Sequence, residues 1–142
     1  EGVDIIAKAG TSLYAAQTGR VVRSQGSLAG NQVKSVAADG TYFIYAHLSA
    51  YADTAPHGAT VAAGTLIGYV GKTGNTSVNH LHFEIHPGGI GPVNPYPILK
   101  AAYGNRPMVK ATAPAVTTTT TTTTTVAPAV PGTPPAAAVA GG

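Results

Sequence analysis

The chain has 142 residues, a formal net charge of +3, and only 9% charged residues. Charge this sparse predicts no phosphate-binding surface, so we expect no nucleic-acid partner, and the mild basicity fits either an ordinary basic protein or attraction to an anionic polymer. No apolar run reaches the roughly 20 residues that cross a membrane. The chain has no cysteine, which excludes disulfides and thiolate metal sites, so the five histidines and the carboxylates are the candidate metal ligands.

Residues 1–104 are predicted to form one domain of short strands. Seven apolar and β-branched runs, each bounded by glycine, Asp-Gly or polar residues, predict strands at 3–7, 12–16, 19–23, 32–37, 41–46, 66–70 and 81–86. Asp39-Gly40 predicts a hairpin between the fourth and the fifth. No window of helical length shows a 3.6-residue period, so we expect an all-β domain, mostly antiparallel sheet.

Residues 105–142 are predicted to form a disordered tail. From Ala111 onward the sequence consists of Ala, Pro, Thr, Val and Gly, and it includes an unbroken run of threonine from Thr117 to Thr125. Such a composition buries too little apolar surface to offset the entropy of the chain. A glycosylated stalk, a spacer and a plain linker to another module all fit this segment.

The most informative segment is the predicted strand that ends at His86. Successive strand residues point to opposite faces, so one face carries apolar side chains and the other carries polar ones. The apolar face consists of Leu81, Phe83 and Ile85, and the polar face of His80, His82, Glu84 and His86. Two imidazoles two residues apart on a strand can converge on a metal ion and its water. The alternative is a solvated polar face.

Three other residues are weighed as candidates. His47 follows the strand predicted at 41–46 and is either part of a site or an exposed histidine at a strand end. Asp4 stands among apolar strand residues, and a buried aspartate is costly unless it is paired, hydrogen-bonded or bound to a metal, so Asp4 needs a partner. His57 lies in a Pro-His-Gly loop without an accompanying ligand and is expected at the surface.

The order of several motifs resembles the LytM or lysostaphin-type zinc metallopeptidases, whose fold is the duplicated hybrid motif. The resemblance covers nearly all of residues 1–99. It is carried by Glu-Gly-Val-Asp-Ile-Ile-Ala-Lys-Ala-Gly-Thr-Ser-Leu-Tyr-Ala-Ala at 1–16, Tyr-Ala-His-Leu-Ser at 45–49, the glycine-rich run at 63–76, His-Leu-His-Phe-Glu at 80–84 and Pro-Val-Asn-Pro at 92–95.

The resemblance implies a zinc (Zn²⁺) site held by a histidine, an aspartate four residues later and the second histidine of His-x-His. Asp4 and His82 match the last two, and the first would fall immediately before Glu1, so this chain alone is expected to hold zinc weakly. His80 and His47 match the two catalytic histidines that are not ligands, with His80 expected as general base and His47 as stabiliser of the carbonyl oxygen. Glu84 either orients an imidazole or is a surface carboxylate. His86 is expected at the rim.

The function that this resemblance implies is a zinc-dependent endopeptidase that hydrolyses peptide stems or cross-bridges of bacterial peptidoglycan. Such a protein is expected to be exported, wall-associated and monomeric. The alternative is a catalytically inactive relative that binds the wall or activates another hydrolase, but such relatives usually lack the metal residues, and four of the five expected positions are filled here. A carrier module is disfavoured because Lys72 lies in a Gly-Lys-Thr-Gly loop and not in a tight hairpin. A phosphate loop is disfavoured because the spacing of the preceding glycines is wrong and no helix is expected to follow. Which bond is cut stays open.

Overall fold

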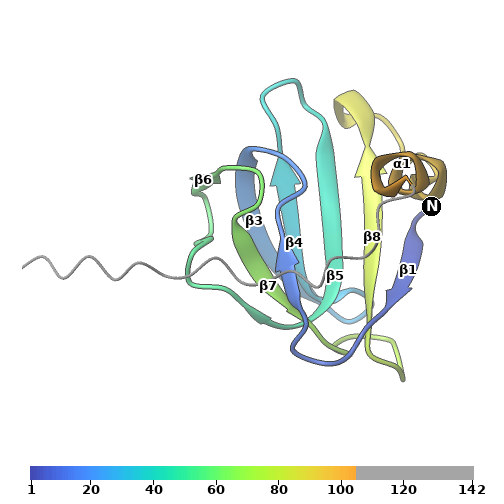
Figure 1. Cartoon of the computed structure of the whole chain (residues 1–142). Coiled ribbons are helices and arrows are strands. Elements are labelled where there is room, and N and C mark those ends of the chain that lie inside the picture. Colours follow the sequence, from blue (N-terminus) through green and yellow to red (C-terminus); the bar gives the residue numbers. More distant parts are fainter. Residues whose placement is uncertain (105–142) are drawn as a thin grey trace, which may run out of the picture. The chain divides into compact units, whose positions relative to one another are not determined.

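A computed structural model of the chain describes residues 1–104 (Figure 1). Within this range it contains the strands β1 (Val3–Ile6), β2 (Ser12–Tyr14), β3 (Gly19–Gly26), β4 (Gly30–Val36), β5 (Tyr42–Tyr51), β6 (Thr60–Val61), β7 (Leu66–Val70) and β8 (His80–His86), then the 3₁₀ turn η1 (Pro87–Gly89) and the helix α1 (Pro95–Tyr103). The seven predicted strands are all present, and β6 is additional. The predicted tail and its boundary near residue 104 stay predictions, because residues 105–142 lie outside the described range.

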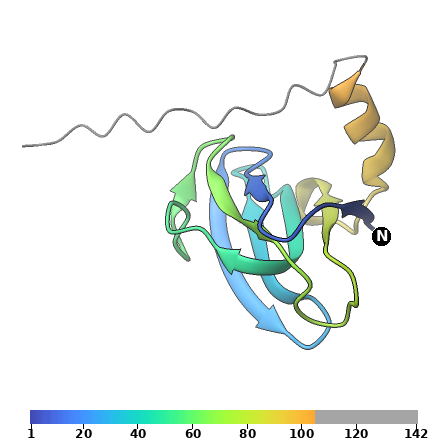
Figure 2. The ribbon, with the colours of Figure 1, turned by 60° about the horizontal axis from the view of Figure 1, so that its bottom comes forward.

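The strands form one antiparallel sheet. Its main arm has the order β1-β8-β5-β4-β3-β6, and a second arm consists of β7, which pairs with β5, and β2, which pairs with β7. The long strand β5 belongs to both arms. Its first half, residues 42–46, pairs with β8, and its second half pairs with β7 at Leu48, Ala50 and Tyr51. On the edge of β5 that faces away from β4, the partner strand therefore changes from β8 to β7 at His47. The view in Figure 2 shows the sheet strongly curved, with α1 beside the end that carries β1 and β8.

His47 is the extra residue of a β-bulge rather than the end of a strand. From Val33 to Asn31, β4 advances two residues while β5 advances three, from Tyr45 to Leu48. His47 has a φ of 63°, the only non-glycine residue with a positive φ among residues 1–104. Such a conformation costs about 1–3 kcal/mol and persists only where its surroundings impose it. The expectation that the strand ends at residue 46 is thus wrong, because pairing resumes beyond the bulge.

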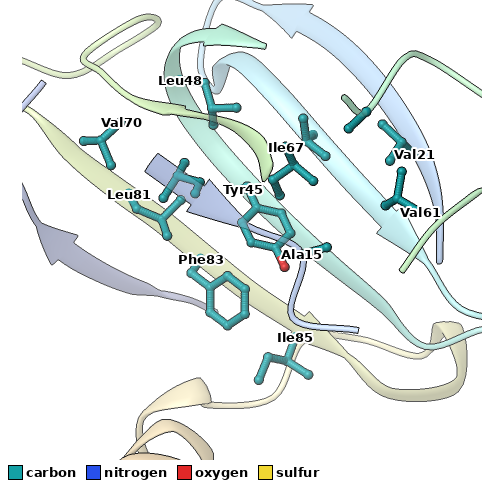
Figure 3. Packing of buried hydrophobic residues seen from close by; sticks show 13 residues of the cluster. Ala15, Val21, Tyr45, Leu48, Val61, Ile67, Val70, Leu81, Phe83 and Ile85 are labelled. Carbon is teal, nitrogen blue, oxygen red and sulfur yellow. The ribbon is translucent and has the colours of Figure 1, made fainter. Parts of the chain in front are cut away.

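The hydrophobic core lies on one face of β8, as the alternation predicted. Leu81, Phe83 and Ile85 are buried there against Tyr45 of β5 and Ile67 of β7 (Figure 3). The Tyr45 ring packs on Phe83 with a centroid distance of 5.2 Å, and its hydroxyl accepts a hydrogen bond from the Ala16 N–H. Packing on this face fixes the register of β8 and leaves the opposite face to its polar residues.

The helix α1 is absent from the sequence-based expectation. Asn94 caps its first turn by accepting a hydrogen bond from Tyr96 N–H at 2.9 Å, and Pro95 occupies the first helical position. Leu99 packs against the core. With nine residues and two prolines in its first turn, the helix is too short to show a convincing 3.6-residue period. The cap and the proline were the available signals.

Two loops interlock beside His47, and a glycine makes their contact possible. Gly30 has a φ of 62°, and a Cβ atom there would overlap the backbone and hydroxyl of Thr73. In the facing loop Gly74 has a φ of 81° and packs on Gly30 in return. Asn75 N–H donates to the Leu28 carbonyl at 2.9 Å. The loop before β4 and the loop before β8 therefore form one packed unit.

This packing predicts that Gly30→Ala lowers the free energy of unfolding by about 2–4 kcal/mol, since left-handed strain adds to a backbone clash. The matched control is Gly26→Ala, because Gly26 lies at the end of β3 and a Cβ there would meet no atom within 4 Å. The control should stay within about 0.5 kcal/mol of the unmodified chain. Urea denaturation measures both, and equal losses would contradict the close approach.

Candidate active site

Three neighbouring strands bring the predicted site residues together. The antiparallel register of β1 with β8 places Asp4 opposite His82. The register of β5 with β8 places Ala46 opposite His82, so that His47 follows directly where β5 turns from β8 toward β7. His80 starts β8 and lies two residues from His82 on the same face. Asp4, His47, His80 and His82 thus meet in one place, although 78 positions separate Asp4 from His82.

Asp4 and His82 form the shortest contact of the group. His82 Nδ1 lies 2.7 Å from Asp4 Oδ1, and His82 Nε2 lies 3.1 Å from Glu84 Oε1. Both partners are carboxylates, which only accept, so the ring donates from both nitrogens as an imidazolium. Burial opposes this charge, but the hydrogen bonds and charges of Asp4 and Glu84 outweigh it and raise the pKa of His82.

Asp4 has a hydrogen-bond partner, His82, as expected from the sequence, but Asp4 is not buried. Its side chain is 60% exposed. The hydrogen bond from His82 is the main effect that lowers the pKa of Asp4, and the neighbouring histidines add to it. The expectation of a buried aspartate is wrong because β1 is an edge strand, so Asp4 lies at the border of the sheet.

His80 and His47 are both held through Nδ1 by backbone carbonyl groups. His80 Nδ1 lies 3.1 Å from the Val78 oxygen, and His47 Nδ1 lies 2.8 Å from the Thr73 oxygen. A carbonyl only accepts, so each Nδ1 carries a proton and each Nε2 is left for other partners. His80 Nε2 lies 3.6 Å from Asp4 Oδ1, and the His47 and His80 rings are 4.6 Å apart.

Glu84 and His86 form a second layer behind His82. Glu84 accepts from His82 through Oε1 and from His86 Nε2 through Oε2, at 2.7 Å. Burial opposes ionisation of Glu84, but these two hydrogen bonds outweigh it and lower its pKa. Of the two readings of Glu84, the geometry therefore favours the carboxylate that contacts an imidazole over the one that faces only solvent.

His86 is buried, not at the rim. It is 7% exposed, and its ring stacks on Tyr42 with a centroid distance of 4.2 Å and an interplanar angle of 14°. The opposing register of β5 and β8 places the two residues directly opposite each other, which explains the stacking. Lys34 Nζ lies 3.6 Å from the centroid of the Tyr42 ring. The expectation that His86 lies at the rim is wrong, because β8 stays paired with β5 up to its last residue.

The site opens into a shallow groove of about 240 Å³. Its lining consists of Leu28, Ala29, Gln32, Ile44, Ala46, His47, His82 and Glu84. His57 lies apart from this groove, in an exposed loop where Nδ1 contacts the backbone of Arg23, as expected for a surface histidine.

The donor set of the site suits zinc, because an imidazole nitrogen and a carboxylate oxygen are both ordinary ligands of this ion. His82 Nδ1–H donates a hydrogen bond to Asp4 Oδ1. A metal ion would take the place of that proton, as ligation requires the deprotonated nitrogen. Within residues 1–104 no group of three or more such side chains is arranged to hold a metal ion.

The sequence did not indicate the carbonyl partners of the two histidines, Thr73 and Val78. Both lie in the loop between β7 and β8, and a backbone carbonyl has no signature of its own in a sequence. The glycines on either side of Lys72 and Thr73 were the available signal, since they mark a loop that approaches another backbone closely.

The fold is that of bacterial peptidase catalytic domains. The catalytic domain of the antimicrobial peptidase lysostaphin from Staphylococcus simulans superposes with a TM-score of 0.63 at 33% identity, over 70% of this chain and 77% of that one. A zinc-containing peptidase from Vibrio cholerae gives a TM-score of 0.60 at 28% identity, over 65% of this chain and 28% of that one.

The model of Peptidase family M23 matches residues 1–95, and the chain belongs to this family. The DD-carboxypeptidase/endopeptidase Mpg of Neisseria meningitidis serogroup B is 38% identical over 96 residues, which cover 66% of this chain and 21% of the relative. The chain thus spans about a fifth of the length of this relative. The resemblance to the LytM and lysostaphin type is confirmed. In the described range, no helix is long and apolar enough to cross a membrane.

Proposed function

We propose that the chain is the catalytic part of a zinc-dependent endopeptidase that hydrolyses peptide stems or cross-bridges of peptidoglycan outside the cell. The observation that carries the proposal is the meeting of Asp4 and His82 at 2.7 Å, with His80 and His47 beside them. Family membership and the zinc-containing relative support the metal. The substrate class follows from the resemblance to LytM-type enzymes.

Asp4 and His82 would hold the metal, which supplies an acidified water and polarises the scissile carbonyl when bound. His80 would accept a proton at Nε2 from the attacking water and later give it to the leaving amine, because its Nδ1–H is fixed by the Val78 carbonyl. His47 in its protonated form donates from Nε2 to the carbonyl oxygen as charge develops there. Glu84 holds His82 in orientation through Nε2.

The test of the metal site adds one residue. A chain extended by a histidine directly before Glu1 should bind zinc at least about tenfold more tightly than the present chain, because a third protein ligand completes the usual set for a zinc site with an open position. Titration calorimetry in the presence of a competing chelator measures the affinity. The matched control carries an alanine at the added position and should bind like the unextended chain.

Equal affinity of the histidine and alanine extensions would show that this position is not a ligand. Cleavage is assayed with the histidine-extended chain on purified walls of several cross-link types, through the release of soluble fragments. A chain that holds zinc and sediments with walls but cleaves none of them would support the inactive, wall-binding alternative instead.

A further inference from the structure

Thr73 connects the loop between β7 and β8 to the bulge that carries His47. Its carbonyl oxygen accepts from His47 Nδ1 at 2.8 Å. Its hydroxyl donates to the Leu48 carbonyl at 2.8 Å and accepts from the Asn31 N–H at 2.9 Å. Leu48 follows His47 in β5, and Asn31 is the residue of β4 that pairs with Leu48. One threonine thus binds the His47 ring and the backbone on both strands beside it.

We propose that Thr73 is the positioning residue of His47. Its hydroxyl anchors the loop so that its carbonyl accepts from His47 Nδ1–H and holds the ring, which leaves Nε2 to serve the groove. When the ring takes up a second proton, Nδ1–H stays bound to Thr73 and Nε2–H is the donor that the proposed function requires. The inference rests on the proposed function, in which His47 acts on the substrate carbonyl. Thr73 itself need not touch the substrate.

The bulge explains why His47 needs such an anchor. At a φ of 63° His47 is in a strained conformation, and β5 changes its pairing there from β8 to β7. His47 N–H donates to the Ala29 carbonyl at 2.8 Å, which holds the backbone but not the ring. Among the contacts of the imidazole, the hydrogen bond to the Thr73 carbonyl is the one that selects a tautomer.

A threonine hydroxyl suits this position because both of its hydrogen-bonding functions are used. Valine has nearly the same shape but would leave the Asn31 N–H without its acceptor. The Leu48 carbonyl would lose the hydrogen bond from the Thr73 hydroxyl and keep the one from Asn31 Nδ2 at 3.1 Å. Gly30 packs so closely on Thr73 that a side chain at position 30 could not replace the hydroxyl. Serine keeps both functions.

The test measures the tautomer of His47 in the 142-residue chain without added metal, by long-range ¹H–¹⁵N correlation at a pH where the ring is neutral. We expect predominant Nδ1–H in the unmodified chain and in Thr73→Ser, and comparable populations of both tautomers in Thr73→Val. The matched control is Thr54→Val, which removes a hydroxyl that donates to the Leu66 carbonyl at an exposed site. It should leave the His47 tautomer unchanged.

A kinetic arm follows in the histidine-extended chain with zinc. Thr73→Val should lower kcat about 10- to 100-fold, the range typical of a lost outer partner, with KM within about twofold, and Thr73→Ser should restore the rate. A merely structural threonine would lower the thermal midpoint without moving the tautomer, and that result would overturn the proposal. A His47 protonated on Nε2 in the unmodified chain would also overturn the proposal, and this measurement needs no variant. Because the tautomer is read without zinc, an inactive chain refutes the proposed function alone.

Discussion

His82→Ala in the histidine-extended chain is expected to abolish both zinc retention and wall hydrolysis. The substitution removes a ligand and leaves Asp4 Oδ1 without its 2.7 Å partner. The loss of zinc affinity should exceed the roughly 10- to 100-fold that the loss of an outer partner causes, because a ligand itself is removed. Elemental analysis after dialysis measures the metal, and release of soluble wall fragments measures the activity.

The control for this variant is His57→Ala, which removes an imidazole from an exposed loop outside the groove. It should keep both zinc and activity. Full zinc content in His82→Ala would contradict the assignment of His82 as a ligand, whereas loss of zinc in both variants would point to a general effect on the fold. Circular dichroism of the three chains separates these cases, because β8 must stay folded for the comparison to hold.

His80→Ala should separate metal binding from catalysis. We expect the variant to keep its zinc and to lose a factor of about 100 to 10,000 in rate, the usual contribution of a positioned acid or base. The reason is geometric, since His80 Nδ1 is engaged by the Val78 carbonyl while Nε2 lies 3.6 Å from Asp4, next to the expected metal position. Zinc content and initial rates on purified walls are the two measurements.

The outcomes for His80→Ala are distinct. A rate within a few-fold of the unmodified chain would remove His80 from the mechanism, and loss of zinc would make it a ligand instead of a base. His57→Ala serves again as the control for removal of one imidazole. A variant that holds zinc, loses hydrolysis and still sediments with walls is the expected result.

Much of this protein was readable from its sequence. The alternation from His80 to His86 determined that one face of β8 is apolar and the other polar, because the period of a strand is two residues and burial fixes its register. Glycines and Asp39-Gly40 marked where strands end. The order of motifs identified the family and indicated that Asp4, His47, His80 and His82 belong together, although no local pattern places Asp4 beside His82.

Only the tertiary structure decided how those residues are held. The change of partner along β5, from β8 to β7, depends on strands that are distant from β5 in the sequence, and it occurs at the bulge that carries His47. The burial of His86 follows from stacking on Tyr42 across two strands, and the exposure of Asp4 follows from the edge position of β1. The carbonyls of Thr73 and Val78, which fix the tautomers of His47 and His80, belong to the backbone, and every residue has one. Sequence specifies which side chains are present, whereas the direction of a carbonyl is set by the packing of the loop that contains it.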